Sequence, residues 1–314
     1  MITVAFAYPD ERMPRTVFYE KLSGSIKALH CFVDQSEPPD LIFPQEDTSM
    51  ETNWPRYGRP DTAFLRGRFD LTTHYQYLNR LIAAGRPMCI INMHPFLRLP
   101  LELAAFSNVM VADINLLTWE RSINPRTISM PAFPITVGSF NTEARQVLVS
   151  FRGTMSHPCR QALREIDNGS SIIVDIVAKE NHFGQIDAET QETDIAYVEL
   201  LENSVFALVP RGDTEFSYRL LEVMSFGCIP IIISDGLIPP FDRLINWEDC
   251  AIRIPENRIT RIPDLIGAIS PGRIAEMQLA VRHIYSTYLG GFTEVATSIV
   301  TEAAMILSRM HRQS

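Results

Sequence analysis

The hydrophobic and polar positions of this 314-residue chain alternate between short apolar runs and longer amphipathic stretches, which predicts strands followed by helices. The predicted strands lie at residues 2–8, 40–44, 88–93, 109–112, 147–151 and 172–177, then in two runs ending at Pro210 and Ser234, and near 247–254. The predicted helices lie at residues 17–29, 71–84, 99–106, 194–203, 262–269, 270–289 and 292–311, with another beginning at Pro158. Strands that alternate with helices are typical of parallel-sheet α/β domains.

This alternation runs through both halves of the chain, whose length suffices for two domains with separate cores. We therefore expect an N-terminal Rossmann-like domain over residues 1–143 and a second one over residues 144–290. The proline-punctuated stretch at 125–134 leads from one to the other. The last helix, at 291–314, is expected to return to the first domain.

One segment of the second domain concentrates charge where a ligand would bind. Residues 208–235 read as buried strand, basic polar loop, helix, glycine stop and buried strand, which is a βαβ unit. Ligands of such sheets sit at the carboxyl ends of strands, beside helix N-termini. Arg211, Arg219 and a helix N-terminus capped by Ser217 therefore predict an anion site, most simply for a diphosphate.

Neighbouring residues extend this predicted site. Gly212 lets the backbone approach the ligand, and Arg152-Gly153 forms a second cationic turn at the end of another strand. Glu222 lies three residues after Arg219 on the same helical face and could accept hydrogen bonds from a ribose. The alternative is structural: Arg219 and Glu222 would form an exposed helical pair and Arg152 a surface charge.

Composition narrows the class of partner. A formal net charge of −9 argues against a nucleic-acid partner, because no basic surplus exists to neutralise phosphates. The five cysteines are widely spaced without a C-x-x-C pair, which favours reduced thiols over disulfides or a zinc site. Neither G-x-G-x-x-G nor G-x-x-x-x-G-K-[ST] occurs, which disfavours a dehydrogenase or a kinase.

The N-terminal run and the hydropathy bear on location. The first residues lack the pattern of a signal peptide, and no apolar run reaches the ~18 residues of a membrane span. We expect a cytoplasmic protein without an integral membrane segment, for which peripheral membrane contact stays open.

Several separated motifs occur in an order that resembles the exostosin family, glycosyltransferase family 47. They lie between residues 205 and 256 and include Pro210-Arg211-Gly212, Phe216-Ser217-Tyr218-Arg219, Gly227-Cys228-Ile229-Pro230, Ser234-Asp235-Gly236 and Asn246-Trp247. Upstream, Phe151-Arg152-Gly153, followed by Arg160 and Leu163, is similar to the start of the family's donor domain. The resemblance covers roughly residues 147–256.

The resemblance implies a GT-B fold, in which two Rossmann-like domains face a cleft and the second holds a nucleotide-sugar. It implies inverting transfer of a hexosyl or pentosyl group, without a metal ion or cofactor, from a UDP-sugar to a glycan hydroxyl. The absence of a D-x-D triplet agrees with metal independence. The chain is short beside the animal members and lacks their anchor and second transferase domain, so we expect polysaccharide or glycan synthesis other than heparan sulfate polymerisation.

The resemblance also assigns residues to the donor. Arg211, Arg219 and Arg152 would contact the diphosphate, and Glu222 would bind ribose or the donor sugar. The full expected donor site is Arg152, Gly153, Arg211, Gly212, Ser217, Tyr218, Arg219, Glu222, Ser234 and Asp235.

Inversion needs a base that takes the proton of the acceptor hydroxyl. Loops at strand ends of the first domain offer Asp47 and Glu46 as the leading candidates, then Asp10, with His94 as an acceptor-side candidate. Trp54 and Tyr57 are candidates for stacking on an acceptor sugar. Each of these residues could instead be structural, and a catalytically silent sugar-nucleotide- or glycan-binding protein on the same fold is the alternative function.

Overall fold

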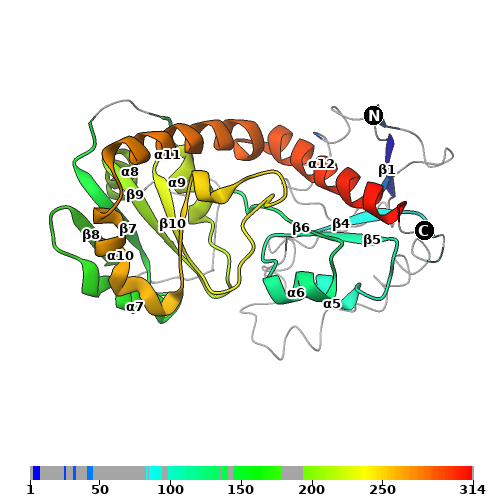
Figure 1. Cartoon of the computed structure of the whole chain (residues 1–314), viewed down its shortest axis with the longest axis horizontal. Helices are drawn as coiled ribbons and strands as arrows, with labels where there is room; N and C mark the ends of the chain where they lie inside the picture. The colour runs from blue at the N-terminus through cyan, green and yellow to red at the C-terminus, as the bar shows by residue number, and fades with distance from the viewer. Residues whose placement is uncertain are drawn as a thin grey trace. The chain divides into compact units, whose positions relative to one another are not determined.

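The computed structural model of the chain describes residues 3–7, 25, 31–32, 41–44, 83, 85–93, 98–134, 136–140, 144–177 and 194–312 (Figure 1). The chain divides into two compact units: unit 1 comprises Met1–Met130 with Gly291–Ser314, and unit 2 comprises Pro131–Gly290. The predicted helices at 17–29 and 71–84 lie almost entirely outside the described residues.

The first boundary between the units falls at Met130, earlier than the division expected after residue 143. The reason is that the segment at 136–138 packs within unit 2. There the backbone N–H of Thr136 donates to Glu222 Oε1 (3.2 Å) and that of Gly138 donates to Ser225 Oγ (2.9 Å).

Unit 1 is built on a six-stranded parallel sheet in the order β2-β1-β3-β4-β5-β6. Its strands are β1 (Thr3–Ala7), β2 (Cys31–Phe32), β3 (Leu41–Pro44), β4 (Met88–Asn92), β5 (Val109–Asp113) and β6 (Thr127–Ser129). Strands β4 and β5 are buried along their whole length, as expected of apolar runs in a parallel sheet that is covered on both faces.

Three helices with described ends belong to unit 1: α5 (Leu99–Glu102), α6 (Thr118–Ile123) and α12 (Phe292–Met310). Helix α5 is shorter than the predicted 99–106, because the N–H groups of Ala104 and Phe106 donate to carbonyl oxygens three residues earlier and not four. Helix α12 buries an apolar stripe and packs against β6, which confirms that the C-terminal helix returns to the first unit. No described helix is both long and apolar enough to cross a membrane.

Unit 2 is built on a five-stranded parallel sheet in the order β11-β10-β9-β7-β8. Its strands are β7 (Val147–Thr154), β8 (Ile172–Val177), β9 (Ser204–Pro210), β10 (Ile229–Ile233) and β11 (Ile252–Ile254). The predicted parallel-sheet α/β class is thereby confirmed in both units.

Helices cover both faces of the second sheet. Helices α8, α9 and α11 lie on one side in Figure 1, and α7 and α10 lie on the other. The helical elements are α7 (Cys159–Ala162), η1 (Leu163–Ile166), α8 (Ile195–Glu202), α9 (Arg219–Ser225), η2 (Trp247–Asp249), η3 (Glu256–Arg261), α10 (Ile262–Gly267), α11 (Pro271–Ile284) and η4 (Tyr285–Leu289). The predicted cap of α8 is confirmed, since the Asp194 side chain accepts from the Tyr197 N–H.

Candidate functional site

The strand order of unit 2 reverses between β7 and β9. From β7 the chain steps to β8 on one side, and it then returns to β9 on the other side. Ligands of open α/β sheets bind outside the carboxyl ends of the strands at such a reversal. The candidate site is therefore made by the residues that follow Thr154 and Pro210.

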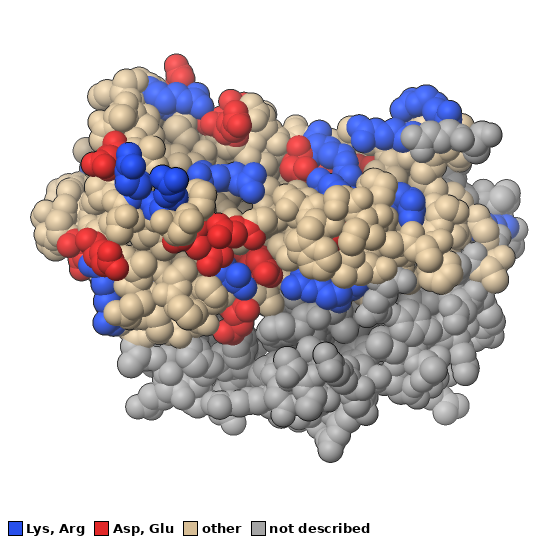
Figure 2. Space-filling view, turned by 60° about the horizontal axis from the view of Figure 1, so that its bottom comes forward, with Lys and Arg blue, Asp and Glu red and all other residues tan. Residues whose placement is uncertain are grey.

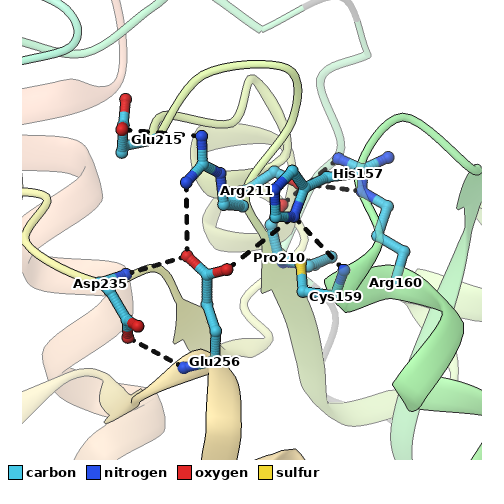
Figure 3. A network of polar contacts seen from close by, with 8 residues as sticks. All are labelled: His157, Cys159, Arg160, Pro210, Arg211, Glu215, Asp235 and Glu256. Carbon is cyan, nitrogen blue, oxygen red and sulfur yellow. Dashed lines mark hydrogen bonds and ion pairs between the residues drawn. The ribbon is translucent and has the colours of Figure 1, made fainter.

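Arg211 is the first residue after β9, and its side chain is charge-paired without being hydrogen-bonded. Its Nη1 lies 3.5 Å from Glu256 Oε1 and its Nη2 lies 3.6 Å from Glu215 Oε1, while only 18% of the side chain is exposed (Figure 3). Its Nε is buried and has no hydrogen-bond partner. A buried donor without an acceptor is costly, so this N–H is placed to donate to an acceptor that a ligand could bring.

Arg160 joins the two loops of the site. It is buried, and its guanidinium donates three hydrogen bonds to carbonyl oxygens: Arg211 (3.0 Å), Thr154 (2.8 Å) and Pro210 (3.3 Å). Burial and the nearby Arg219 lower the pKa of Arg160 to about 10, which leaves it cationic at neutral pH. Because all three acceptors are uncharged, its positive charge remains available to an anion.

Gly212 faces two polar groups from the loop after β7. A Cβ built on Gly212 would lie 3.9 Å from both Ser156 Oγ and Arg160 Nη2. Ser156 Oγ is itself buried without a hydrogen-bond partner. Sequence reasoning missed Ser156, because its only signal is a position shortly after a predicted strand.

Arg219 and Gly153 are fitted to each other. Arg219 Nη2 donates to the Arg152 carbonyl (2.6 Å), and its guanidinium carbon lies 4.8 Å from the ring centre of Phe151 and 5.4 Å from that of Tyr197. A Cβ on Gly153 would lie 2.3 Å from Arg219 Nη2. Gly153 therefore makes room for the Arg219 guanidinium.

Arg152 was predicted to lie in a turn. Instead, β7 continues to Thr154 and pairs Arg152 with Asp175 of β8. Its guanidinium forms an ion pair with Asp175, and its Nε donates to both carboxylate oxygens of Asp194 (2.9 and 3.2 Å). The hydrogen bond to Asp194 raises the pKa of Arg152. Two carboxylates thus occupy Arg152, and its predicted contact with a diphosphate stays a prediction.

Glu222 is 6% exposed, which excludes the alternative of a solvated helical pair. Its Oε2 accepts from the Tyr197 hydroxyl (2.8 Å) and its Oε1 accepts from the Thr136 N–H (3.2 Å). Burial raises the pKa of Tyr197, so the phenol keeps its proton and donates it to this bond. Glu222 and Arg219 both contact Tyr197: Glu222 accepts from its hydroxyl, and the Arg219 guanidinium lies over its ring. The predicted contact of Glu222 with ribose stays a prediction.

The predicted cap of α9 is wrong. The helix begins at Arg219, its N-cap is Tyr218, and no side chain caps it; the Ser217 carbonyl, not its hydroxyl, accepts from the Leu220 N–H (3.2 Å). Tyr218 is 37% exposed, with its ring 5.0 Å from that of Phe216 in an edge-on contact.

Two further predicted donor residues follow β10, which ends at Ile233. Ser234 is buried, and its Oγ has no hydrogen-bond partner, whereas Asp235 is exposed. Asp235 pairs reciprocally with Glu256: the Asp235 N–H donates to Glu256 Oε1 (3.2 Å) and the Glu256 N–H donates to Asp235 Oδ1 (2.9 Å) (Figure 3). Sequence reasoning missed Glu256, which follows a strand of only three residues.

One group of described residues could converge on a metal ion. The ligand atoms of His157, Cys159 and Glu256 lie within 4.8 Å of one another, a donor set that suits zinc (Figure 3). Burial and Glu256 raise the pKa of the Cys159 thiol to about 11, and Arg211 and Arg160 stand beside the group. These cations and the protonated thiol oppose a divalent ion, so we assign no metal to it.

The expected acceptor side lies outside the described residues. This holds for all its candidates: Asp10, Glu46, Asp47, Trp54, Tyr57 and His94. Strands β1 and β3 are parallel neighbours, and the order of the first sheet reverses between them.

Basic and acidic side chains are interspersed on the face drawn in Figure 2, as far as its described residues go. The described part of this face therefore carries no broad basic surface.

Two α/β units with parallel sheets and a last helix that returns to the first unit form an α/β fold of the GT-B type. Residues 85–269 match the Exostosin GT47 domain, and the chain belongs to this family.

Similar proteins include the Exostosin-1 homolog of Caenorhabditis elegans, 33% identical over 168 residues, which make up 50% of this chain and 44% of that protein. Exostosin-1 of Drosophila melanogaster is 29% identical over 173 residues, 51% of this chain and 23% of that protein. The chain thus spans less than half the length of these relatives. Among solved structures, WaaG, a glycosyltransferase involved in lipopolysaccharide biosynthesis, is 12% identical, with a TM-score of 0.41, 96% of this chain covered and 100% of that one.

Proposed function

We propose that the chain transfers a sugar from a nucleoside diphosphate, with UDP as the carrier, to a glycan hydroxyl, with inversion and without a metal ion. Membership of the exostosin family supports the class of reaction. The position of the arginines at the strand reversal of unit 2 supports the diphosphate as the group that is bound.

The observation that carries this proposal is the buried Nε of Arg211, which has no hydrogen-bond partner. It stands next to Gly212, near the unpartnered Ser156 hydroxyl and the uncompensated charge of Arg160. A diphosphate offers acceptor oxygens and negative charge to all of these groups at once.

The same groups would assist bond cleavage. When the glycosidic bond to the carrier breaks, negative charge grows on the departing diphosphate, and fixed cations stabilise it. Arg211 and Arg160 would serve this role where other transferases use a divalent ion. The base that takes the acceptor proton would come from unit 1, and Asp47, Glu46 and Asp10 remain its candidates.

A thermal-shift screen of UDP- and GDP-sugars in EDTA tests the proposal. We expect UDP-sugars to raise the Tm of the wild-type chain. Arg211→Gln should abolish that rise, because glutamine keeps a polar side chain but lacks the charged guanidinium group. The control is Arg261→Gln, which removes a 58% exposed arginine paired with Asp264 and should leave the rise intact.

The outcomes separate the alternatives. A Tm that no nucleotide or nucleotide-sugar moves would refute the donor site. A selective rise that persists in Arg211→Gln would place the diphosphate elsewhere. Binding without hydrolysis or transfer for any acceptor tried would favour the catalytically silent binding protein.

A further inference from the structure

Glu256 ties together the loops that end four strands of the second sheet. Its carboxylate lies beside Arg211 after β9 and accepts from the N–H of Asp235 after β10, and its own backbone N–H donates back to Asp235 (Figure 3). Its Oε2 lies 3.8 Å from Nδ1 of His157, which follows β7. Glu256 itself opens η3, and Pro255 alone separates it from the end of β11.

This bracing fixes the place of a negative charge. Glu215 also pairs with Arg211, but it lies four residues away on the same loop and can move with it. Glu256 belongs to a different loop and is held at both its backbone and its side chain by Asp235. A ligand that binds Arg211 therefore meets the Glu256 carboxylate at close range.

The charge of Glu256 is not cancelled from its other side at neutral pH. His157 is the group that faces Oε2, and burial together with Arg211 lowers its pKa, which keeps the imidazole neutral. The N–H of Cys159 donates to Nδ1 of His157 (3.3 Å), an arrangement that needs this nitrogen unprotonated. Among the described residues, Arg211, with its Nη1 3.5 Å away, is the cation that pairs with this carboxylate.

A transferase that uses a nucleoside-diphosphate sugar must bind the donor and then release a nucleoside diphosphate. These two ligands share the diphosphate but differ in charge. Cleavage frees the terminal phosphate, whose second ionisation has a pKa of about 6, so the product carries close to one extra negative charge at pH 7. A fixed carboxylate beside the diphosphate repels the product more than the donor.

We propose that Glu256 is a specificity-determining residue of the nucleotide site, which disfavours the more highly charged nucleoside diphosphate and thereby promotes its release after transfer. This inference rests on the proposed function. It concerns the balance between donor and product at Arg211, not the existence of the site.

The experiment compares two ligands that differ in this one charge. They are UDP and UDP whose terminal phosphate is blocked as a methyl ester, and their Kd values are measured by calorimetry at pH 7.5 in EDTA. Glu256→Gln is the test variant, because an amide oxygen can still accept from Asp235 while the charge is removed. Glu276→Gln, which removes a 69% exposed carboxylate paired with Arg273, is the control.

We expect Glu256→Gln to lower the Kd of UDP by about tenfold and that of the methyl ester by about threefold, since the fixed charge near the terminal phosphate acts on two charges of that phosphate in UDP and on one in the ester. The preference for UDP over its ester should therefore rise about threefold, and Glu276→Gln should leave both Kd values unchanged. The ratio of the two Kd values does not depend on how much of the variant is folded.

Four results would count against the inference. Equal Kd changes for both ligands, or weaker binding of both by Glu256→Gln, would overturn it and make Glu256 a positioning residue for Arg211. Unchanged Kd values would overturn it as well. Failure of the wild-type chain to bind either ligand would refute the proposed function itself, and the inference with it.

Discussion

Replacing Gly153 by alanine tests the fit between β7 and Arg219. The new Cβ would lie 2.3 Å from Arg219 Nη2, closer than real Cβ atoms come to another heavy atom, and 3.0 Å from its Cζ, which is an unusually tight contact. Gly153 has an ordinary strand backbone, so alanine itself is tolerated there. The cost therefore comes from moving the arginine.

The arginine cannot move without loss. It donates to the Arg152 carbonyl, and its guanidinium lies over the rings of Phe151 and Tyr197. A hydrogen bond from a charged donor is worth about 1.5–3 kcal/mol, and a cation–π contact about 0.5–1 kcal/mol. We expect Gly153→Ala to lower the free energy of unfolding by about 2–4 kcal/mol, or the Tm by about 5–15 °C for a unit of this size.

Urea and thermal unfolding, followed by circular dichroism, measure this loss. Gly272→Ala is the matched control, because a Cβ on Gly272 meets no atom within 4 Å and alanine favours the helix, by about 0.5–1 kcal/mol. In an Arg219→Ala background, Gly153→Ala should cost less than about 0.5 kcal/mol, since the obstructing group is gone. A full cost in that background, or equal effects of the two alanine variants, would refute the reasoning.

Two other substitutions test buried polar groups. Asp113 is 2% exposed, and burial raises its pKa from 3.8 to about 7, although Asn92 and Asn115 donate hydrogen bonds to it. The folded state therefore holds this proton more tightly than the unfolded state does. As a result, the free energy of unfolding falls as the pH rises from about 4 to 7. Asp113→Asn should remove this pH dependence. In urea unfolding, the stability of the variant relative to wild type should be up to about 4 kcal/mol greater at pH 8 than at pH 4, and parallel pH profiles of the two proteins would contradict this. Tyr197→Phe removes the hydroxyl that donates to buried Glu222 and should cost about 1.5–3 kcal/mol in the same assay, whereas a loss below about 0.5 kcal/mol would show that this bond adds little.

Most strands of the described sheets could be predicted from the chain, because strands buried on both faces read as continuous apolar runs. Val109–Asp113 and Ile229–Ile233 are examples, with every residue buried. The strand at Thr127–Ser129 was missed, since three residues between prolines carry no periodic signal. The strand from Val147 was predicted to end at Phe151, because Gly is depleted inside strands and Arg152-Gly153 reads as a turn. Its extension to Thr154 depends on pairing with the next strand, which only the fold supplies.

The residues of the candidate site likewise fall into those that the sequence predicts and those that only the fold brings together. Arg211 and Gly212 were predicted, because a strand, a basic loop and a helix follow one another directly in the sequence. Glu256 and Ser156 could not be found, since they enter the site from other strand ends, and their proximity to Arg211 is a property of the sheet order. The role given to Ser217 was wrong because helix capping depends on where the first helical residue lies, and such boundaries are poorly fixed by sequence.

An acidic protein can bind a diphosphate if the arginines of one site differ in how far their charges are cancelled. Arg152 is held by two aspartates at hydrogen-bonding distance, and their carboxylates neutralise its charge. Arg211 is balanced by two glutamates at 3.5 and 3.6 Å, which hold its charge but leave its hydrogen bonds to a ligand.

Arg160 and Arg219 contribute the rest of the positive charge. Their hydrogen bonds to the backbone go to carbonyl oxygens, and both guanidinium groups lie near the Phe151 ring, at 5.7 and 4.8 Å from its centre. Neither a carbonyl nor a ring cancels a full charge, so the buried side of the site stays cationic although the chain carries a net charge of −9. Burial also protects this charge from salt, which screens exposed pairs far more strongly. Affinity for the diphosphate should therefore depend less on ionic strength than binding to an exposed basic patch would.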